Sequence, residues 1–167
     1  MALFEPIFAA LDAAGVRYVV VGGVAVVLHG HARFTADLDI AIDLSPDGTR
    51  DAMAALGGLG LRPRLPVSAG DFADPEIRAG WVRERGMQVF SLYDPGEPLR
   101  SVDVFVENPI AFEDLWARSE VVELEGVQTR IASIADLIEL KRRADRPQDR
   151  TDIDALAAIE RARKEGQ

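Results

Sequence analysis

The chain of 167 residues contains no cysteine, so it has neither a disulfide framework nor a thiolate nucleophile. No apolar run approaches the roughly 20 residues that a membrane-spanning helix needs, so we expect no membrane partner. Lysine is nearly absent, with two lysines against 17 arginines. The sequence also has no internal repeat and no low-complexity tract. These absences exclude disulfide-rich scaffolds, transmembrane helices and repeat arrays.

Acidic residues outnumber basic ones by 28 to 19, which gives a formal net charge of −9. This balance argues against a broad nucleic-acid-binding surface, because phosphate contacts require clustered lysine and arginine. A local basic patch beside a site is still compatible with it. The basic residues that gather late in the chain are Arg130, Lys141, Arg142, Arg143, Arg146 and Arg150. The alternative is that they form only a solvated helix face.

The composition is that of an ordinary globular protein, with 48% hydrophobic and 28% charged residues. We expect a single domain over residues 1–167, with a core over about 16–107 and a C-terminal hairpin and helices over about 108–165. The first residues carry no basic leader and are interrupted by Glu5 and Asp12. A signal peptide is therefore not expected, and the cytoplasm is the predicted compartment.

Hydrophobic periodicity and turn residues predict strands interleaved with helices. A first helix is predicted over 4–14, and Ser45-Pro46 predicts the start of a helix that ends at Gly57-Gly58. Strands are predicted at 18–21, at 87–92, 101–106, 121–124 and 127–131, and in the segment that carries Asp37 and Asp39. Further helices are predicted within 71–81, over 109–118, after Ser133 and after Pro147. This alternation favours an α+β (α/β layered) fold, a mixed β-sheet flanked by helices.

The stretch from Tyr18 to Asp43 carries the densest chemical pattern of the chain. It begins with a continuous β-branched run at 18–21, which is typical of a strand covered on both faces. Gly22 and Gly23 follow, and glycines at this point allow positive φ and let a ligand approach the backbone. The short helix predicted after them would direct free N–H groups toward that ligand, which suits a phosphate.

Three aspartates on predicted strands form the second part of the pattern. Asp37 and Asp39 are two residues apart on one strand, so both carboxylates point to the same face. Like charges this close repel each other, and a divalent cation offsets the repulsion. Asp103 lies within an apolar strand, where a lone carboxylate is costly and needs a partner. If the two strands are neighbours, the three carboxylates converge as in two-metal sites for phosphoryl transfer.

The order of these elements resembles the signature of the nucleotidyltransferase superfamily, which has the polymerase-β-like fold. The string Gly-Gly-x-Ala, then His29-Gly30, Arg33, Thr35 and Asp-Leu-Asp-Ile, is similar to its bacterial AbiEii-like and minimal nucleotidyltransferase branch. Residues 24–36 separate the second glycine from the first aspartate, a wider gap than in many minimal members. The gap is closer to that of the toxin-like and antibiotic-modifying branches. The superfamily has a third acid on a later strand, and Asp103 is the best match.

The resemblance implies Mg²⁺-dependent nucleotidyl transfer, with Asp37, Asp39 and Asp103 as the catalytic and metal-binding residues. Asp37 and Asp39 would hold one Mg²⁺ on the triphosphate, and Asp39 and Asp103 would hold a second. Asp103 could also take the proton of the acceptor hydroxyl as a general base. Gly22 and Gly23 would hold phosphate oxygens. The hydroxyl would attack the α-phosphorus of an NTP such as ATP, and pyrophosphate would leave.

Two basic residues complete the predicted nucleotide site. Arg33 precedes the aspartate strand and could reach phosphates as a bidentate donor, or else form an ion pair with Asp37 or Asp43. Lys141 is one of only two lysines, and it ends a string from Asp136 that resembles the C-terminal signature of the family. In that signature the lysine faces the nucleotide, and a point charge on a flexible stem suits a triphosphate. The alternative is an exposed lysine on an amphipathic helix.

Other polar residues near these motifs have structural alternatives. His29 and His31 are ligands or substrate contacts in one interpretation and capping or packing residues in the other. Thr35 would satisfy backbone groups near the start of the strand. Asp149 and Asp152 would orient Lys141 or Arg146, or favour the first turn of the last helix through its dipole.

The acceptor would be a tRNA end, a protein side chain or a small hydroxylated molecule such as an antibiotic. The AbiEii-like resemblance implies a role in a toxin–antitoxin pair, with an antitoxin or another protein as partner, although the chain is short for that family. A second class of function is a catalytically inactive module that binds a nucleotide or a partner in the same cleft. A third is an Asp-x-Asp glycosyltransferase or phosphatase, which would not need two glycines before a short helix.

Overall fold

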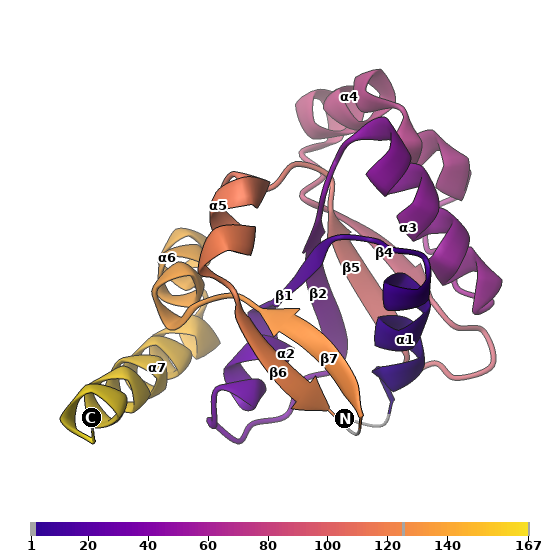
Figure 1. The fold of residues 1–167 in the computed structure, drawn as a ribbon. Helices are drawn as coiled ribbons and strands as arrows, with labels where there is room; N and C mark the ends of the chain where they lie inside the picture. The colour runs from indigo at the N-terminus through magenta and orange to yellow at the C-terminus, as the bar shows by residue number, and fades with distance from the viewer. Residues whose placement is uncertain (1–2, 125, 167) are drawn as a thin grey trace.

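The computed structural model describes residues 3–124 and 126–166. In this part of the chain, seven strands form one mixed sheet in the order β3-β4-β5-β2-β1-β7-β6. The strands are β1 Tyr18–Val21, β2 Asp37–Ile42, β3 Arg62–Pro63, β4 Val89–Tyr93, β5 Ser101–Phe105, β6 Glu120–Leu124 and β7 Val127–Ile131. Helices α1, α3 and α4 lie on one side of the sheet, and α6 and α7 lie on the other (Figure 1). The predicted α+β fold, a mixed sheet flanked by helices, is confirmed.

Local sequence accounts for where the helices begin. The helices are α1 Glu5–Ala13, α2 Gly22–Leu28, α3 Pro46–Gly58, α4 Pro75–Arg85, α5 Phe112–Arg118, α6 Ile134–Ala144 and α7 Pro147–Glu165, with a 3₁₀ turn η1 at Ala69–Ala73. At the start of α3, the Ser45 hydroxyl accepts a hydrogen bond from the Gly48 N–H at 3.1 Å, and proline occupies the first turn. Ser133 caps α6 in the same way by accepting from the Asp136 N–H at 3.2 Å. Both predicted caps are confirmed.

The centre of the sheet brings distant segments of the chain together. Strand β2 pairs with β1 in antiparallel and with β5 in parallel orientation. Strand β1 also pairs in parallel with β7. The strand that carries Asp37 and Asp39 is therefore enclosed on both edges, and β5 with Asp103 is its direct neighbour.

The hydrophobic core lies on the sheet face opposite the aspartates. Residues of β2, β4 and β5 alternate, and those pointing into this core are almost completely buried: Leu38, Ile40, Phe90, Leu92, Val102 and Val104. The Phe90 ring contacts the Phe72 ring at 5.2 Å between centroids and stacks on the Trp81 ring at 5.3 Å. These contacts attach η1 and α4 to the sheet.

Two local features differ from the sequence expectation. The segment predicted to hold one short helix within 71–81 forms η1 and then α4, because the Asp74 carboxylate accepts from the backbone of Glu76 and Ile77 and starts a new helix. The edge strand β3 was not predicted, since two residues beside a proline show no period-two pattern. Gly22 and Gly23 are the first residues of α2 rather than a separate turn, although Gly22 has the positive φ of 64° that was expected.

The structure also bears on the expectation about membranes. Within residues 3–124 and 126–166, none of the helices combines the length and the apolar character that crossing a bilayer requires.

We predict that Phe90→Ala lowers the free energy of unfolding by about 3–5 kcal/mol, because it leaves a cavity between two packed rings. Urea denaturation followed by circular dichroism measures this difference. Val121→Ala serves as the control, since Val121 is 52% exposed and should change stability little. Equal stability of the two variants would contradict the packing described for this core.

Candidate active site

The site is built on one row of residues that crosses five neighbouring segments of the sheet. Val21 of β1 is the Cα partner of Asp39 on β2, and Asp39 is the partner of Asp103 on β5. Asp103 is in turn the partner of Ser91 on β4. The Arg64 N–H donates to the Ser91 carbonyl at 3.0 Å, which extends the row past the end of β3. The register therefore places the carboxylates of Asp39 and Asp103 directly beside each other. Asp37 and Ser101 form the corresponding pair at the start of the same two strands, 64 residues apart in sequence.

Both carboxylates are held in a protein environment that disfavours their charge. Burial, together with the negative charges of Asp103 and Asp37, raises the pKa of Asp39 to about 7, against the opposing influence of Arg146 and Lys141. Burial also raises the pKa of Asp103, while a hydrogen bond with Ser91 opposes that rise. The two groups are thus partly desolvated and mutually repelling, which is the situation that a bound cation relieves.

Asp37 lies on the same strand face but at the outer end of β2. Its side chain is exposed, and the Ser101 hydroxyl donates a short hydrogen bond to its carboxylate. It does not line the cavity that contains Asp39 and Asp103. Its charge is still close enough to raise the pKa of both. The structure therefore brings two of the three predicted carboxylates to the cavity and leaves the third at its margin.

Positions 22 and 23 require glycine, because side chains of the site occupy the space that a Cβ would need. A Cβ on Gly22 would collide with the Asp39 carboxylate, and one on Gly23 would collide with the Arg33 guanidinium and the Thr35 hydroxyl. Gly22 also has a φ of 64°, which other residues rarely adopt. The two glycines thus allow the start of α2 to touch the aspartate strand, a role beyond the ligand approach expected from the sequence.

A cavity of about 730 Å³ extends from these glycines along the sheet and beneath α6. Predicted site residues that line it are Gly22, Gly23, Arg33, Asp39, Asp103 and Lys141. The far part of its wall is more apolar and includes Met87, Val89, Phe105, Leu137 and Leu140. Asn108 also lines it and donates its amide to the Ile42 carbonyl at 2.9 Å.

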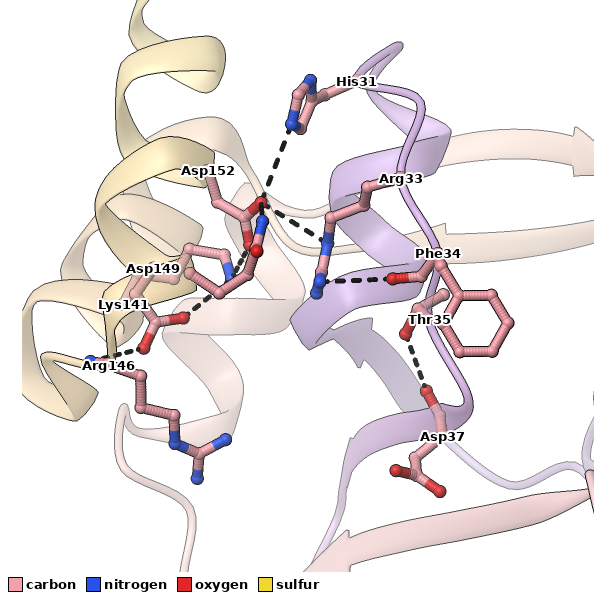
Figure 2. Close-up of polar contacts among 10 residues, drawn as sticks. His31, Arg33, Phe34, Thr35, Asp37, Lys141, Arg146, Asp149 and Asp152 are labelled. Atoms are coloured by element: carbon pink, nitrogen blue, oxygen red, sulfur yellow. Dashed lines mark hydrogen bonds and ion pairs between the residues drawn. The ribbon is translucent and has the colours of Figure 1, made fainter.

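Asp152 is the centre of a cluster that joins α6, α7 and the loop before β2. Its side chain is completely buried, and the Lys141 Nζ donates to its Oδ2 at 2.6 Å. The Arg33 Nε lies 3.4 Å from its Oδ1, and the His31 Nε2 lies 3.8 Å from the same atom. Figure 2 shows these three basic groups converging on one carboxylate. The ion pair suggested for Arg33 with Asp37 or Asp43 was therefore assigned to the wrong partner.

Lys141 is a buried residue and not the exposed lysine of the alternative interpretation. It is 7% exposed, and its ammonium donates to Asp149 at 3.2 Å as well as to Asp152. Asp149 also accepts from the Arg146 N–H at 3.0 Å and so caps α7. The Arg146 guanidinium is not held by this contact, and it is exposed at the cavity wall. Its positive charge opposes the raised pKa of Asp39 and Asp103.

The remaining polar residues have structural contacts. His29 is 5% exposed, and its Nε2 lies 2.8 Å from the Ala132 carbonyl, which supports the packing interpretation. The Thr35 hydroxyl donates to the Asp37 carbonyl at 3.4 Å, as expected for a residue that satisfies the start of a strand.

Three residues of the site were not predicted as such: Ser91, Arg64 and Arg146. The alternation of buried and half-buried residues along β4 could have placed Ser91 on the open sheet face. The pairing of β4 with β5, which brings Ser91 to Asp103, depends on the assembled sheet. Arg146 was named as one of several late basic residues, as a follower of Lys141 in the string that resembles the C-terminal signature, and as a group that Asp149 or Asp152 would orient, but not as a residue of the nucleotide site.

The donor set fits a divalent cation in chemistry and position. Asp39 and Asp103 offer carboxylate oxygens from adjacent strands, which Mg²⁺ prefers. Among residues 3–124 and 126–166, no group of three or more histidine, aspartate or glutamate side chains is arranged to hold a metal ion. The fit therefore depends on this pair of aspartates together with oxygens that a phosphate ligand would bring.

Solved structures with this fold include enzymes that modify antibiotics. The lincomycin-bound lincosamide antibiotic adenylyltransferase LnuA aligns with a TM-score of 0.65 and 16% identity, over 95% of this chain and 97% of that one. ANT(2″)-Ia in complex with adenylyl-2″-tobramycin aligns with a TM-score of 0.57 and 17% identity, over 98% and 90%. An antigenic nucleotidyltransferase-like protein from Paracoccidioides brasiliensis aligns with a TM-score of 0.55 and 16% identity, over 95% and 73%. At these identities the likeness concerns the fold.

Sequence comparison identifies the family directly. No curated protein matches the chain significantly. The model of a family described as "Nucleotidyltransferase of unknown function (DUF6036)" matches residues 2–163. This match covers nearly the whole chain, and it agrees with the sheet, the glycine pair and the strand aspartates described above. The chain therefore belongs to this family of nucleotidyltransferases.

Proposed function

We propose that the protein catalyses Mg²⁺-dependent transfer of a nucleoside monophosphate from an NTP to a hydroxyl group of a small-molecule acceptor. The observation that carries this proposal is the facing register of Asp39 and Asp103 beside Gly22. Two adjacent carboxylates that line one cavity together with Gly22 suit a metal-bound polyphosphate. ATP is the NTP we expect.

In this proposal Asp39 and Asp103 would hold the cation, and Asp37 would assist from the end of β2. When bound, Mg²⁺ would neutralise phosphate charge and lower the pKa of the acceptor hydroxyl. The acceptor oxygen forms a bond to the α-phosphorus, the bond to the bridging oxygen breaks, and pyrophosphate leaves. Asp103 takes the hydroxyl proton as a general base.

The triphosphate would lie on the β1 side of the aspartates. Gly22 and Gly23 bring backbone to the ligand there, and Arg146 offers a guanidinium from the opposite wall of the cavity. Arg33 and Lys141 line the same region, but both contact Asp152. We therefore propose that they bind phosphate with the donors that remain, in positions that Asp152 and Asp149 hold in place.

Two structural relatives support a small-molecule acceptor, since their names describe a lincosamide adenylyltransferase and a complex with an adenylylated tobramycin. Nothing comparable supports a tRNA or protein acceptor, an AbiEii-like assignment or a toxin–antitoxin pair with its antitoxin. Those expectations, and the cytoplasmic location, stay predictions.

A second candidate is a catalytically inactive module that binds the nucleotide alone. It is favoured by the position of Asp37, whose carboxylate is engaged by Ser101 outside the cavity. Release of pyrophosphate from ATP in the presence of Mg²⁺ and acceptors distinguishes the two functions. ATP binding with no pyrophosphate released under any condition would favour the inactive module.

We predict that Asp39→Ala abolishes Mg²⁺-dependent binding of ATP. The melting temperature of the metal-free protein should stay unchanged or rise, because one of several repelling carboxylates is removed. Isothermal titration with ATP, with and without Mg²⁺, and thermal denaturation in EDTA measure the two effects. Asp154→Ala, which removes an exposed aspartate of α7, is the control. Clear destabilisation of metal-free Asp39→Ala would identify Asp39 as a structural partner instead.

We predict that Lys141→Ala lowers the free energy of unfolding by about 3–5 kcal/mol, because it leaves the buried Asp152 with less compensating charge. It should also weaken ATP binding by about 1–3 kcal/mol, the range for a charge-assisted hydrogen bond. Lys164→Ala is the matched control, because Lys164 is the other lysine and pairs with Glu160 on the surface.

Lys141→Arg should recover only part of both losses, since a guanidinium differs in shape and reach. Chemical denaturation and isothermal titration at low salt with Mg²⁺ give the two quantities separately. A loss of stability without any loss of ATP affinity would restrict Lys141 to a structural role.

A further inference from the structure

The residue row that crosses the site has two chemically different ends. On one side of Asp39 it reaches Val21, which is followed by Gly22 and Gly23. On the other side of Asp103 it reaches Ser91 and then Arg64. Since the glycines belong to the proposed triphosphate side, two routes to Asp103 remain for the acceptor hydroxyl: along the cavity past Val89 and Phe105, or across the sheet edge past Ser91 and Arg64. This inference rests on the proposed function.

The Arg64 side chain lies on the same sheet face as Asp103. Its guanidinium carbon is 5.3 Å from the centre of the Tyr93 ring. Tyr93 is two residues after Ser91 on β4, so the two side chains share a face, and Ser91 hydrogen bonds with Asp103. Arg64 is also close enough to Asp103 for its charge to lower the pKa of that carboxyl.

A second arginine accompanies Arg64. Arg62 is the Cα partner of Tyr93, and strand alternation places it on the face that Arg64 occupies. Both arginines are exposed. Within the described residues neither guanidinium takes part in an ion pair, whereas the nearby Arg100 is paired with Asp94 at 3.0 Å.

These two guanidinium groups differ in position, since they lie on the sheet face of Asp103, from other exposed arginines of the described residues that also form no ion pair, such as Arg142 and Arg161. The chain has 28 acidic and 19 basic residues, so acidic partners are abundant. Arg62 of β3 and Arg64 just after it place a local positive field at the edge of this face, beside the negative field of its carboxylates. Planar guanidinium groups bind phosphate oxygens in a bidentate manner.

We propose that Arg62 and Arg64 form an anion subsite that binds a phosphate group on the hydroxyl acceptor. The acceptor is then a small phosphate ester with a free hydroxyl, such as a sugar phosphate. Neighbouring strands lie roughly 4.8 Å apart, so β3 is about 10 Å from β5. The reach of an arginine side chain covers part of this distance, and one sugar ring between hydroxyl and phosphate covers the remainder.

The same field disfavours a polycationic acceptor. Tobramycin, which appears as its adenylyl product in the complex of ANT(2″)-Ia, is an aminoglycoside with several amino groups. Its charges would be repelled by Arg62 and Arg64. We therefore expect this chain to catalyse the same kind of nucleotidyl transfer as proposed above, but to an acceptor of a different class from tobramycin.

The experiment measures transfer of label from α-labelled ATP, with Mg²⁺, to five acceptors. These are ribose 5-phosphate, ribose, a short single-stranded RNA with a free 3′ end, tobramycin and lincomycin. We expect kcat/KM to be about 10- to 100-fold higher for ribose 5-phosphate than for ribose. Preference for RNA over ribose 5-phosphate would contradict the proposal.

Arg64→Glu should lower kcat/KM for ribose 5-phosphate relative to kcat/KM for ribose, so that the preference is lost, and Arg64→Lys should retain part of it. Arg161→Glu, the same charge reversal at an exposed arginine of α7, is the matched control and should behave as the unmodified protein does. Equal transfer to ribose and ribose 5-phosphate, preferential labelling of tobramycin or lincomycin, or identical behaviour of the two Glu variants would overturn the proposal.

If no acceptor is labelled, the proposed transfer fails, and the subsite is tested by binding alone. Ribose 5-phosphate is then titrated into the protein saturated with Mg²⁺ and α,β-methylene-ATP, and amide chemical shifts are followed by NMR. Shifts at Arg64 and Ser91 that disappear in Arg64→Glu support the subsite. Absence of such shifts overturns it.

Discussion

Asp39 and Asp103 face each other across the β2–β5 pair, and the cost of that arrangement explains much of what surrounds them. Each carboxylate is partly desolvated and lies in the field of the other. The core on the opposite face of the sheet, where Leu38, Ile40 and Val104 are fully buried, sets the register that keeps them together. A register shift of one residue would turn the aspartates into that core. The packing of the apolar face therefore keeps the two repelling carboxylates side by side on the other face.

Positive charge is supplied to the site from parts of the chain that do not belong to the sheet. Arg146 reaches the cavity from the start of α7, and Arg64 reaches Asp103 from the edge of the sheet. Lys141 and Arg33 are instead anchored by the buried carboxylate of Asp152 (Figure 2). The C-terminal helices thus hold the loop before β2 in place, and their packing contributes to the geometry of the carboxylates.

Much of this arrangement could be predicted from the sequence because its patterns are local. Gly22-Gly23, the spacing of Asp37 and Asp39, and the caps at Ser45 and Ser133 each depend on neighbouring residues. Asp103 was found because an acid in an apolar strand is costly wherever the strand lies. The partner of Arg33 could not be predicted, since Asp152 is distant in sequence and only the docking of α7 brings them together. The roles of Ser91 and Arg64 depend in the same way on which strands pair.

The site forms from residues that are far apart in sequence, and this affects the order in which it forms during folding. The hydrogen bond from Ser101 to Asp37 closes a span of 64 residues, and the contact of His29 with Ala132 closes one of 103. Such closures cost chain entropy before their contacts form, which slows folding. While the chain is being synthesised, Asp37 and Asp39 are made long before β5 and Asp103, and they can stay hydrated during that time. Their repulsion with Asp103 arises only when β5 pairs with β2, and Arg33 and Lys141 are held in place only after Asp152 has been made. The repulsion among the three aspartates therefore opposes only the last stages of folding, when β5 and the C-terminal helices join the rest of the structure.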